Sequence, residues 1–432
     1  MAALYGFPIL GAVLILVVQL AGGIERFAAS LLDPTVALTL VVLVILLGIW
    51  RLLAMGDAMA AGRSARPIRR SLVFPAYILL TAIVIAAHAW VGAVTWAFYD
   101  AGSHIFVGQV GPNATPPLDL ATPNPSDNSV DFQATPFPTP PTTSNRITVL
   151  ITGIDSGRGR EHALTDTIML VSVDPDDGKV AMLSFPRDIS NFPLYGGGTY
   201  KGKINSLMTY ARLHPDEFPD GGLPTLAQQV GFLAGVPVQY FASINLDGFE
   251  RMINIVGGVD VDNLKPINDP AYDWRDGTKG FHLAAGPVHL NGRNGLAYVR
   301  SRQGVGDNDF TRAARQQQVL SALRKKMITP AVIARLPDLI SAVGSSVKTN
   351  YPVDKVADLL TIAGRVSDDT TTRKVLGPPY ALHPPSSTTG GIYTLKMDMD
   401  RMARLSIELF GEDSRYSDAA TGTKPSASPT VP

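Results

Sequence analysis

Three long apolar runs at the start of the chain constrain its fold more than any other feature. Residues 4–21, 36–50 and 72–99 contain no Asp, Glu, Lys or Arg. Each run approaches or exceeds the length that a helix needs to cross the hydrocarbon core of a bilayer. The first run also lacks the basic segment of a cleaved signal peptide, which favours a retained helix. We therefore predict an anchor of three transmembrane helices over residues 1–100, in which His88 is a helix-packing or interfacial histidine.

The arginines between the runs predict the orientation of this anchor. The first loop has one basic residue, Arg26, beside Glu25 and Asp33. The second loop has one acidic residue, Asp57, and five arginines: Arg51, Arg63, Arg66, Arg69 and Arg70. Because arginine-rich loops stay in the cytoplasm, the chain after Tyr99 is expected outside it. The sequence thus predicts a multi-pass protein of the cell membrane with an extracytoplasmic domain.

A change of composition marks the limits of that domain. Residues 101–145 are rich in Pro, Thr, Ser and Asn and show no apolar periodicity, as expected for an extracytoplasmic linker. Residues 412–432 end in TGTKPSASPTVP and resemble a second unfolded segment. Residues 146–411 therefore form the one folded domain that we predict.

Charge and cysteine content exclude several classes of function. The 37 basic and 37 acidic side chains give a formal net charge of zero, so no overall field attracts nucleic acid, and we expect no nucleic-acid partner. The chain contains no cysteine, which excludes disulfides, thiolate nucleophiles and thiolate-ligated metals. Charge-driven binding, if present, must be local.

Within the domain, strand and helix patterns alternate. Short apolar or β-branched runs predict strands at 147–154, 167–174, 179–185 and 238–246, and a further one near 373–377. Helical spacing recurs at 203–213, 224–235, 309–327, 352–366 and 399–409, and residues 247–263 predict a helix followed by an edge strand. This interleaving predicts an α/β fold, a three-layer α/β/α domain with a mixed central sheet.

Polar residues gather at the ends of these predicted elements. They are Asp155 and Asp166 around the first two strands, Arg187 and Asp188 after the third, Lys203 and Asn205 at a helix start, Arg300 and Arg302 in AYVRSR, and Asp309, Arg312, Arg315 and Gln316 in DFTRAARQQ. If AYVRSR is extended, its two arginines share a face. Arg312, Arg315 and Gln316 share a face of a helix.

Five or six converging cations with few local counter-ions would be stable only around an anion. Guanidinium groups bind phosphate oxygens in pairs, so a diphosphate is the predicted occupant, and two strand-end aspartates suit Mg²⁺. Simpler interpretations exist. Arginines at helical spacing usually lie on a solvated face, and Asp166 could merely begin a strand. The glycine-rich 153–160 segment lacks the Lys-Ser/Thr ending of a phosphate loop.

The motifs resemble those of the LytR-CpsA-Psr family. GID, TDTIMLVSVDP, LSFPRD, KIN, GGVDVD and YVRSR followed by D-x-x-R-x-x-RQQ occur in the order and approximate spacing of that family across 147–327. The resemblance implies an anchored, Mg²⁺-assisted phosphotransferase that moves a glycopolymer from a polyprenyl-diphosphate carrier to peptidoglycan or another envelope acceptor. It also implies roles by position: Asp155 and Asp166 at the metal, Arg187, Arg300 and Arg302 at the diphosphate, and Asp309, Arg312 and Gln316 beside it.

The chain departs from the family pattern in two places. Many members have Arg directly before the Thr/Ser-Asp pair, where this chain has Leu164, and Arg158 or Arg160 could replace that contact. Family members usually have one membrane span. Two rival functions therefore stay open: a polyprenyl-diphosphate hydrolase with water as the acceptor, and a lipid-binding cell-wall regulator without turnover. Asp188 and Asp309 are both candidates for the general base.

Overall fold

The structure is a computed structural model that describes residues 27, 30–62, 70–106, 145–155, 164–302, 306–327, 329–333, 338–339, 344 and 346–417. The chain divides into two compact units. The N-terminal segment to Phe106, with 334–345 and 352–361, forms one unit, and the remainder forms the other. Each unit is described separately below.

The first unit contains two long apolar helices, α3 (Pro34–Gly62) and α4 (Arg70–Ile105), which contact each other. Within them, Pro34–Ala60 and Phe74–Ile105 are long and apolar enough to cross a membrane, and large apolar side chains such as Leu53 and Trp90 are exposed along both. These helices correspond to the second and third predicted spans. The first predicted span, at 4–21, lies outside the described residues, so the predicted count of three stays a prediction.

The position of His88 agrees with a packing role. Its Nδ1 lies 2.8 Å from the carbonyl oxygen of Val84, one turn earlier on α4. Its ring packs against Gly48 of α3, where a Cβ would approach the imidazole to 3.1 Å. The glycine therefore makes room for the ring between the two helices.

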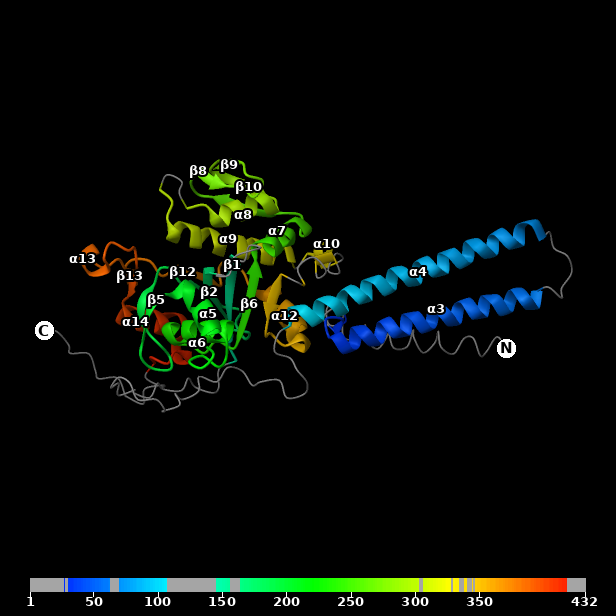
Figure 1. Ribbon diagram of the computed structural model, residues 1–432, viewed down its shortest axis with the longest axis horizontal. Coiled ribbons are helices and arrows are strands. Elements are labelled where there is room, and N and C mark those ends of the chain that lie inside the picture. The colour runs from blue at the N-terminus through cyan, green and yellow to red at the C-terminus, as the bar shows by residue number, and fades with distance from the viewer. Residues whose placement is uncertain are drawn as a thin grey trace. The chain divides into compact units, whose positions relative to one another are not determined.

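The second unit is built on a six-stranded mixed sheet (Figure 1). Its strands, in spatial order, are β11 (Val347–Thr349), β6 (Tyr240–Asn245), β1 (Ile147–Asp155), β2 (Leu164–Val173), β3 (Val180–Ser184) and β12 (Thr371–Val375). The β1–β6 and β3–β12 pairs are parallel, and the other three are antiparallel. This arrangement confirms the predicted mixed sheet, in which the strand near 373–377 is β12.

Side chains alternate between the two faces of this sheet, and helices cover both faces. On one face, Ile168 and Leu170 belong to the main apolar core, into which α5 (Ile204–Leu213), α6 (Gly222–Ala234) and α14 (Met399–Phe410) also pack. On the other, Met169 and Met182 pack with Leu320 of α9 (Asp309–Met327), which contacts β3 and β12, while α7 (Leu246–Ile255) contacts β1 and β6. The predicted α/β/α layering is therefore present.

Several elements lie outside the central sheet. The helix α8 (Gly292–Arg300) packs between α7 and α9. The two-stranded pairs are β4 (Ser190–Pro193) with β5 (Thr199–Lys203), β7 (Val259–Asn263) with β10 (Gly286–Leu290), β8 (Ile267–Asp273) with β9 (Lys279–Leu283), and β13 (Ala381–Leu382) with β14 (Lys396–Met397). The short helices of this unit are α10 (Pro330–Ile333), α13 (Ser386–Thr389) and η2 (Gly411–Asp413), whereas η1 (Val353–Lys355) and most of α12 (Val356–Arg365) belong to the first unit. The strand predicted after α7 is β7, which pairs with β10 and not with the central sheet.

The folded domain continues past its predicted end at Gly411. Asp413 Oδ2 accepts a hydrogen bond from Arg146 Nε at 3.0 Å. The guanidinium of Arg415 lies 4.3 Å from the centroid of the Phe232 ring, and Ser414 is fully buried. Residues 412–417 therefore belong to the domain. The rest of the predicted tail and nearly all of the predicted 101–145 linker lie outside the described residues.

Candidate functional site

A β-bulge positions the first acidic residue of the site. In the β1–β2 ladder, Gly153 pairs with Thr167 and Ile154 pairs with Thr165, which leaves Asp166 as the extra residue of the bulge. Bulges bend a strand and redirect a side chain. The Asp166 carboxylate accepts a hydrogen bond from Arg187 Nη1 at 2.7 Å through Oδ1. Arg187 lies just beyond β3, so neighbouring antiparallel strands bring the two residues together.

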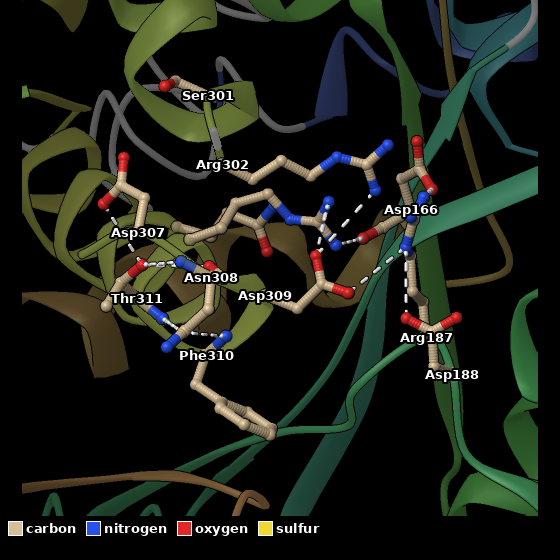
Figure 2. Close-up of polar contacts among 12 residues, drawn as sticks. Asp166, Arg187, Asp188, Ser301, Arg302, Asp307, Asn308, Asp309, Phe310 and Thr311 are labelled. Atoms are coloured by element: carbon tan, nitrogen blue, oxygen red, sulfur yellow. Dashed lines mark hydrogen bonds and ion pairs between the residues drawn. The ribbon is translucent and has the colours of Figure 1, made fainter. Parts of the chain in front are cut away.

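Asp309, the first residue of α9, lies near arginines from three parts of the chain. Its carboxylate lies 3.5 Å from Arg187 Nε and 3.2 Å from Arg312 Nη1. Arg302 Nη1 approaches it at 3.9 Å (Figure 2). Arg312 also donates from Nη2 to the carbonyl oxygen of Asp166 at 3.3 Å. The carboxylate of Asp309 thus holds the guanidinium groups of the site together, and we call Asp166, Arg187, Asp188, Lys203, Arg302, Asp309 and Arg312 the arginine cluster.

Lys203 and Asp188 complete this cluster. Lys203 Nζ donates to Asp188 Oδ1, and Arg187 Nε lies 3.6 Å from the other oxygen. Lys203 ends β5 and precedes α5, as the KIN motif predicts. Asp188 is almost completely buried, and Lys203 is about one-third exposed. The ammonium group of Lys203 therefore lies between the buried carboxylate of Asp188 and the solvent.

The pKa values of Asp188 and Asp309 are shifted in opposite directions. Burial raises the pKa of Asp188, and its hydrogen bond with Asp309 adds to this, outweighing Lys203 and Arg187. Burial also acts to raise the pKa of Asp309, but its hydrogen bond with Asp188 and the charges of Arg312 and Arg187 bring that pKa below its ordinary value. When one proton is shared within such a pair, Asp188 holds it and Asp309 stays ionised.

Two predicted members of the site point elsewhere. AYVRSR is not extended, because α8 continues to Arg300, so Arg300 and Arg302 do not share a face. Arg300 interacts with the hydroxyl group of Tyr272. Arg315 is buried, pairs with Asp307 at 3.1 Å and donates to the carbonyl oxygen of Ser301.

The expected shortage of counter-ions is also wrong. Within the arginine cluster, the cations Arg187, Lys203, Arg302 and Arg312 contact the carboxylates of Asp166, Asp188 and Asp309. Each buried arginine has an ion-pair partner, as expected from the cost of burying a lone charge. Arg302 differs from the others. Its side chain is 40% exposed, and its distance to Asp309 is too long for a hydrogen bond, so its donors can reach a ligand.

Asn205 and Gln316 act on the backbone around the cluster. The backbone N–H of Asn205 donates to the Arg187 carbonyl at 3.4 Å, and its carbonyl accepts from Thr165 Oγ1 at 3.1 Å. Gln316 Nε2 donates to the Val299 carbonyl at 3.2 Å, which joins α9 to the last turn of α8. Both residues therefore hold elements that carry cluster residues.

The donor set partly fits the predicted magnesium ion. Asp166 is about one-third exposed, and no hydrogen bond from the described residues reaches its Oδ2, so this oxygen can take a further ligand. Asp155 ends β1, directly opposite Leu164, but its side chain lies outside the described part of the structure. Within the described residues, no group of three acidic or histidine side chains is placed to hold a metal. A magnesium site here would use two carboxylates and oxygens of the ligand and of water, as Mg²⁺ sites commonly do.

The structure adds residues that the sequence did not suggest. Asp307 is the counter-ion of Arg315, and its position before the helix carries no recognisable motif. Partial burial raises the pKa of Tyr393, and the negative charges of Asp188 and Asp309 add to this shift. Leu395, two residues after Tyr393, donates its backbone N–H to the carbonyl oxygen of Asp188 at 2.8 Å, which holds this segment beside the cluster. No local sequence signal marks Tyr393, because it lies far along the chain from both Asp188 and Asp309.

Leu164 begins β2 with its side chain 37% exposed. It therefore stands at the surface beside the bulge, at the position where the family resemblance led us to expect an arginine. The two arginines expected to compensate, Arg158 and Arg160, lie outside the described residues.

Comparisons with known proteins identify the family of this domain. The family model described as the LytR_cpsA_psr family matches residues 119–416. Curated relatives named polyisoprenyl-teichoic acid–peptidoglycan teichoic acid transferase TagU include one from Bacillus mycoides, 30% identical over 216 residues, covering 50% of this chain and 64% of that protein. Another, from Halalkalibacterium halodurans, is 29% identical over 211 residues, covering 49% and 63%. The matches thus span less than two-thirds of the length of these relatives.

Solved structures also match this chain at low sequence identity, with TM-scores below 0.5. The crystal structure of B. subtilis TagV gives a TM-score of 0.49 at 23% identity, covering 65% of this chain and 99% of that one. A structure titled TagT bound to LIIa-WTA gives 0.45 at 24% identity, covering 62% and 90%.

Proposed function

The chain belongs to the LytR_cpsA_psr family, and on that basis we propose that its domain transfers a glycopolymer from a polyprenyl-diphosphate carrier to a hydroxyl group of peptidoglycan or another cell-envelope acceptor. The arginine cluster is the observation that supports this proposal. Arg302 is exposed with donors available, and Arg187, Lys203 and Arg312 belong to the same cluster. The guanidinium groups of Arg187, Arg302 and Arg312 suit phosphate oxygens. The names of the TagU relatives indicate the same class of reaction.

In the proposed reaction, the acceptor hydroxyl attacks the phosphorus that carries the glycan. A new P–O bond forms to the acceptor, the bond to the bridging oxygen breaks, and polyprenyl phosphate leaves with that electron pair. Arg302 and Arg187 stabilise the charge that builds on the leaving phosphate. Asp188, whose pKa is raised, takes the proton of the hydroxyl group, whereas Asp309 stays ionised and positions the arginines. Mg²⁺ held by Asp155 and Asp166 would neutralise diphosphate oxygens when bound.

A turnover assay of the full chain in detergent tests this function. The substrates are a radiolabelled polyprenyl-diphosphate glycan and cell-wall fragments. Label in the wall polymer supports transfer. Label released as free glycan phosphate instead supports the hydrolase, and saturable lipid binding with neither product supports the non-catalytic regulator, for which the exposed Leu164 is the one structural argument.

The general base is tested by the pH dependence of the reaction. Because a base must be deprotonated, activity is expected to fall as pH drops through the raised pKa of Asp188. Asp188→Asn should lower kcat by roughly 100-fold or more and remove that acidic limb from the residual rate. An unchanged limb in Asp188→Asn would assign the proton to another group.

The metal proposal predicts that Asp166→Ala and Asp155→Ala lose most Mg²⁺-stimulated activity while the domain stays folded, because carboxylates at the edge of a solvated site add little to the core. Asp166→Asn distinguishes the loss of a metal ligand from the loss of the contact with Arg187, because the amide oxygen can still accept the hydrogen bond from Arg187. Asp174→Ala is the matched control: it lies just past the other end of β2 and pairs with Arg146. Full activity and unaltered metal dependence in both alanine variants at 155 and 166 would remove the magnesium assignment.

We also propose that the domain lies outside the cytoplasm, on the basis of the arginine-rich second loop. A reporter that is active only in the cytoplasm, fused after Asp100, is expected to give no signal, and the same reporter fused after Asp57 should be active. The reverse pattern would contradict the orientation and the cell-wall role together.

A further inference from the structure

A cavity of about 130 Å³ lies between the β8–β9 hairpin and the helices α7 and α8, and no residue of the arginine cluster lines it. Figure 1 shows this hairpin beside α8, at the edge of the domain remote from α5 and α6. The hairpin supplies Tyr272 through Asp276 to the wall, α7 supplies Glu250, and α8 supplies Arg293, Leu296 and Arg300. The sequence motifs assign no role to this cavity.

Aromatic rings form one side of the cavity. Tyr272, Trp274 and Phe281 pack together, with ring centroids 4.9 Å apart for Tyr272–Trp274 and 5.8 Å apart for Trp274–Phe281. Tyr272 and Phe281 are buried and anchor the hairpin, whereas Trp274 is only half-buried and lines the cavity. Its indole is fixed by a hydrogen bond from Nε1 to the Gly280 carbonyl at 2.7 Å. The guanidinium of Arg293 also lies 4.3 Å from its ring centroid.

The formal charges of the side chains in the cavity wall sum to zero. The wall contains three arginines and three carboxylates: Arg275, Arg293, Arg300, Glu250, Asp273 and Asp276. Arg275 is paired with Asp247 and lies 3.7 Å from Glu250, and Arg293 pairs with Asp276 at 2.8 Å. The cavity therefore offers many fixed hydrogen-bond donors and acceptors without a net charge, unlike the arginine cluster.

Stability does not account for this arrangement. Exposed ion pairs contribute only about 0–1 kcal/mol each, and Tyr272 and Phe281 already anchor the hairpin. An open cavity with a rigid aromatic side and convergent polar groups is the usual form of a small-molecule site. An aromatic face suits the C–H face of a pyranose ring, and paired arginine and carboxylate groups suit adjacent hydroxyls. A neutral sugar matches these features better than an anion does.

The cavity is rigidly linked to the arginine cluster through Ser301. Arg300 lines the cavity and Arg302 belongs to the cluster, with Ser301 between them. Ser301 Oγ donates to Asp269 Oδ2 at 2.7 Å, and the Ser301 carbonyl accepts from Arg315. All three of these residues are buried. The turn that separates the two sites is therefore held from both sides, which fixes the position of one site relative to the other.

We propose that this cavity is a saccharide-binding subsite, which binds one neutral sugar residue of the glycan substrates while the diphosphate occupies the arginine cluster. The inference rests on the proposed function for the origin of the sugar. Two sources share this chemistry, the glycan of the lipid-linked donor and the glycan strand of the acceptor. Trp274 stacks on the sugar ring, and Arg300 and Glu250 bind its hydroxyl groups.

Calorimetric titration of the full chain in detergent tests the subsite without turnover. The acceptor probe is the disaccharide released from peptidoglycan by a muramidase, and the donor probe is a short-prenyl diphosphate of N-acetylglucosamine. Trp274→Ala and Arg300→Ala are expected to weaken binding of one probe at least about tenfold, and the probe affected identifies the source. Trp274→Phe should retain most of the affinity. Lys265→Ala, an exposed change in the loop just before β8 that does not line the cavity, should bind as the wild type does.

A fluorescence readout makes the test independent of small changes in the fold. The other three tryptophans, Trp50, Trp90 and Trp96, all lie in α3 and α4, so Trp274 is the domain's single tryptophan. The spectrum of the wild type minus that of Trp274→Phe reports the cavity, and the bound sugar is expected to shift it. Saccharide binding of equal affinity in wild type, Trp274→Ala and Arg300→Ala would overturn the proposal, as would no binding of either probe by the wild type.

The failure of this proposal differs from the failure of the proposed function. Arg302→Ala should lose turnover and still bind the acceptor probe or shift the Trp274 spectrum. A wild type that binds saccharide through Trp274 but never transfers glycan would keep the subsite and refute the transferase. Normal transfer kinetics in Trp274→Ala, with wild-type KM for donor and acceptor, would keep the transferase and refute the subsite.

Discussion

Replacing Arg302 by alanine is expected to lower kcat/KM by roughly 30- to 1,000-fold. This corresponds to loss of a charge-assisted contact worth about 2–4 kcal/mol in the transition state. Arg302→Lys should recover only part of the rate, because an ammonium group cannot reproduce the planar fork of a guanidinium. The thermal midpoint should stay at the wild-type value in both variants, because Arg302 is 40% exposed and lies beyond hydrogen-bond distance of Asp309.

Two further arginine variants sharpen this test. Arg401→Ala removes an exposed arginine that pairs with Asp398 at the start of α14, and should leave rate and stability unchanged. Arg300→Ala should act on the KM of a saccharide substrate and preserve kcat, because Arg300 lines the separate cavity. If Arg302→Ala unfolds the domain while Arg302→Lys is fully active, Arg302 is structural and the diphosphate assignment fails. If Arg300→Ala lowers kcat as much as Arg302→Ala does, both arginines act on the diphosphate.

Replacing Asp309 by asparagine is expected to destabilise the domain by on the order of 3 kcal/mol at neutral pH, because buried arginines then lose their shared counter-ion. The pKa of Asp309 lies below its ordinary value of 3.8, so its ionised form stabilises the fold above that pH. That contribution is lost as pH falls through the pKa of the folded state. The difference in thermal midpoint between wild type and Asp309→Asn should therefore narrow below about pH 4.

Asp188→Asn is the matched comparison, because the pKa of Asp188 is shifted the opposite way. A raised pKa means that the fold favours the protonated acid, so wild-type stability is lost as pH rises from 3.8 through the raised value. At neutral pH, Asp188→Asn should have a thermal midpoint equal to or above that of the wild type. Thermal denaturation of the three proteins from pH 3 to pH 8 measures both effects. Equal destabilisation by the two variants at every pH would show that the carboxyls are not distinguished by their surroundings.

The pattern of apolar residues predicted much of the fold correctly. Short apolar runs located β1, β2, β3 and β6, and helical spacing located α5, α6, α9 and α14, because each of these elements packs apolar side chains into the core. Three residues from the motifs at the ends of these elements, Arg187, Lys203 and Asp309, lie in the arginine cluster of the structure. These residues come together because each lies close in the chain to the end of a strand or helix that the sequence predicts.

Local sequence could not decide the state of AYVRSR. Its β-branched and aromatic residues suit a strand, and Gly292 and Gly295 weaken a helix at that point. The structure nevertheless forms α8, which Asn291 caps through a hydrogen bond from Asn294 N to its Oδ1. Tyr298, which this helix buries, donates to Gln318 of α9 at 2.6 Å. Tertiary packing therefore overrode local preference and separated Arg300 from Arg302.

The sequence by itself determined the apolar spans, the strands and helices of the core, and the residues from which a phosphate site could be built. The tertiary structure alone decided which arginine meets which carboxylate. Asp309 holds Arg187 and Arg312, whereas Asp307 holds Arg315, although Arg312 and Arg315 are only three residues apart on the same helix. The physical reason is that an ion pair in a low-dielectric interior depends on distances of a few ångströms between segments far apart in the chain. Periodicity specifies the face on which a residue lies, and packing specifies its partner.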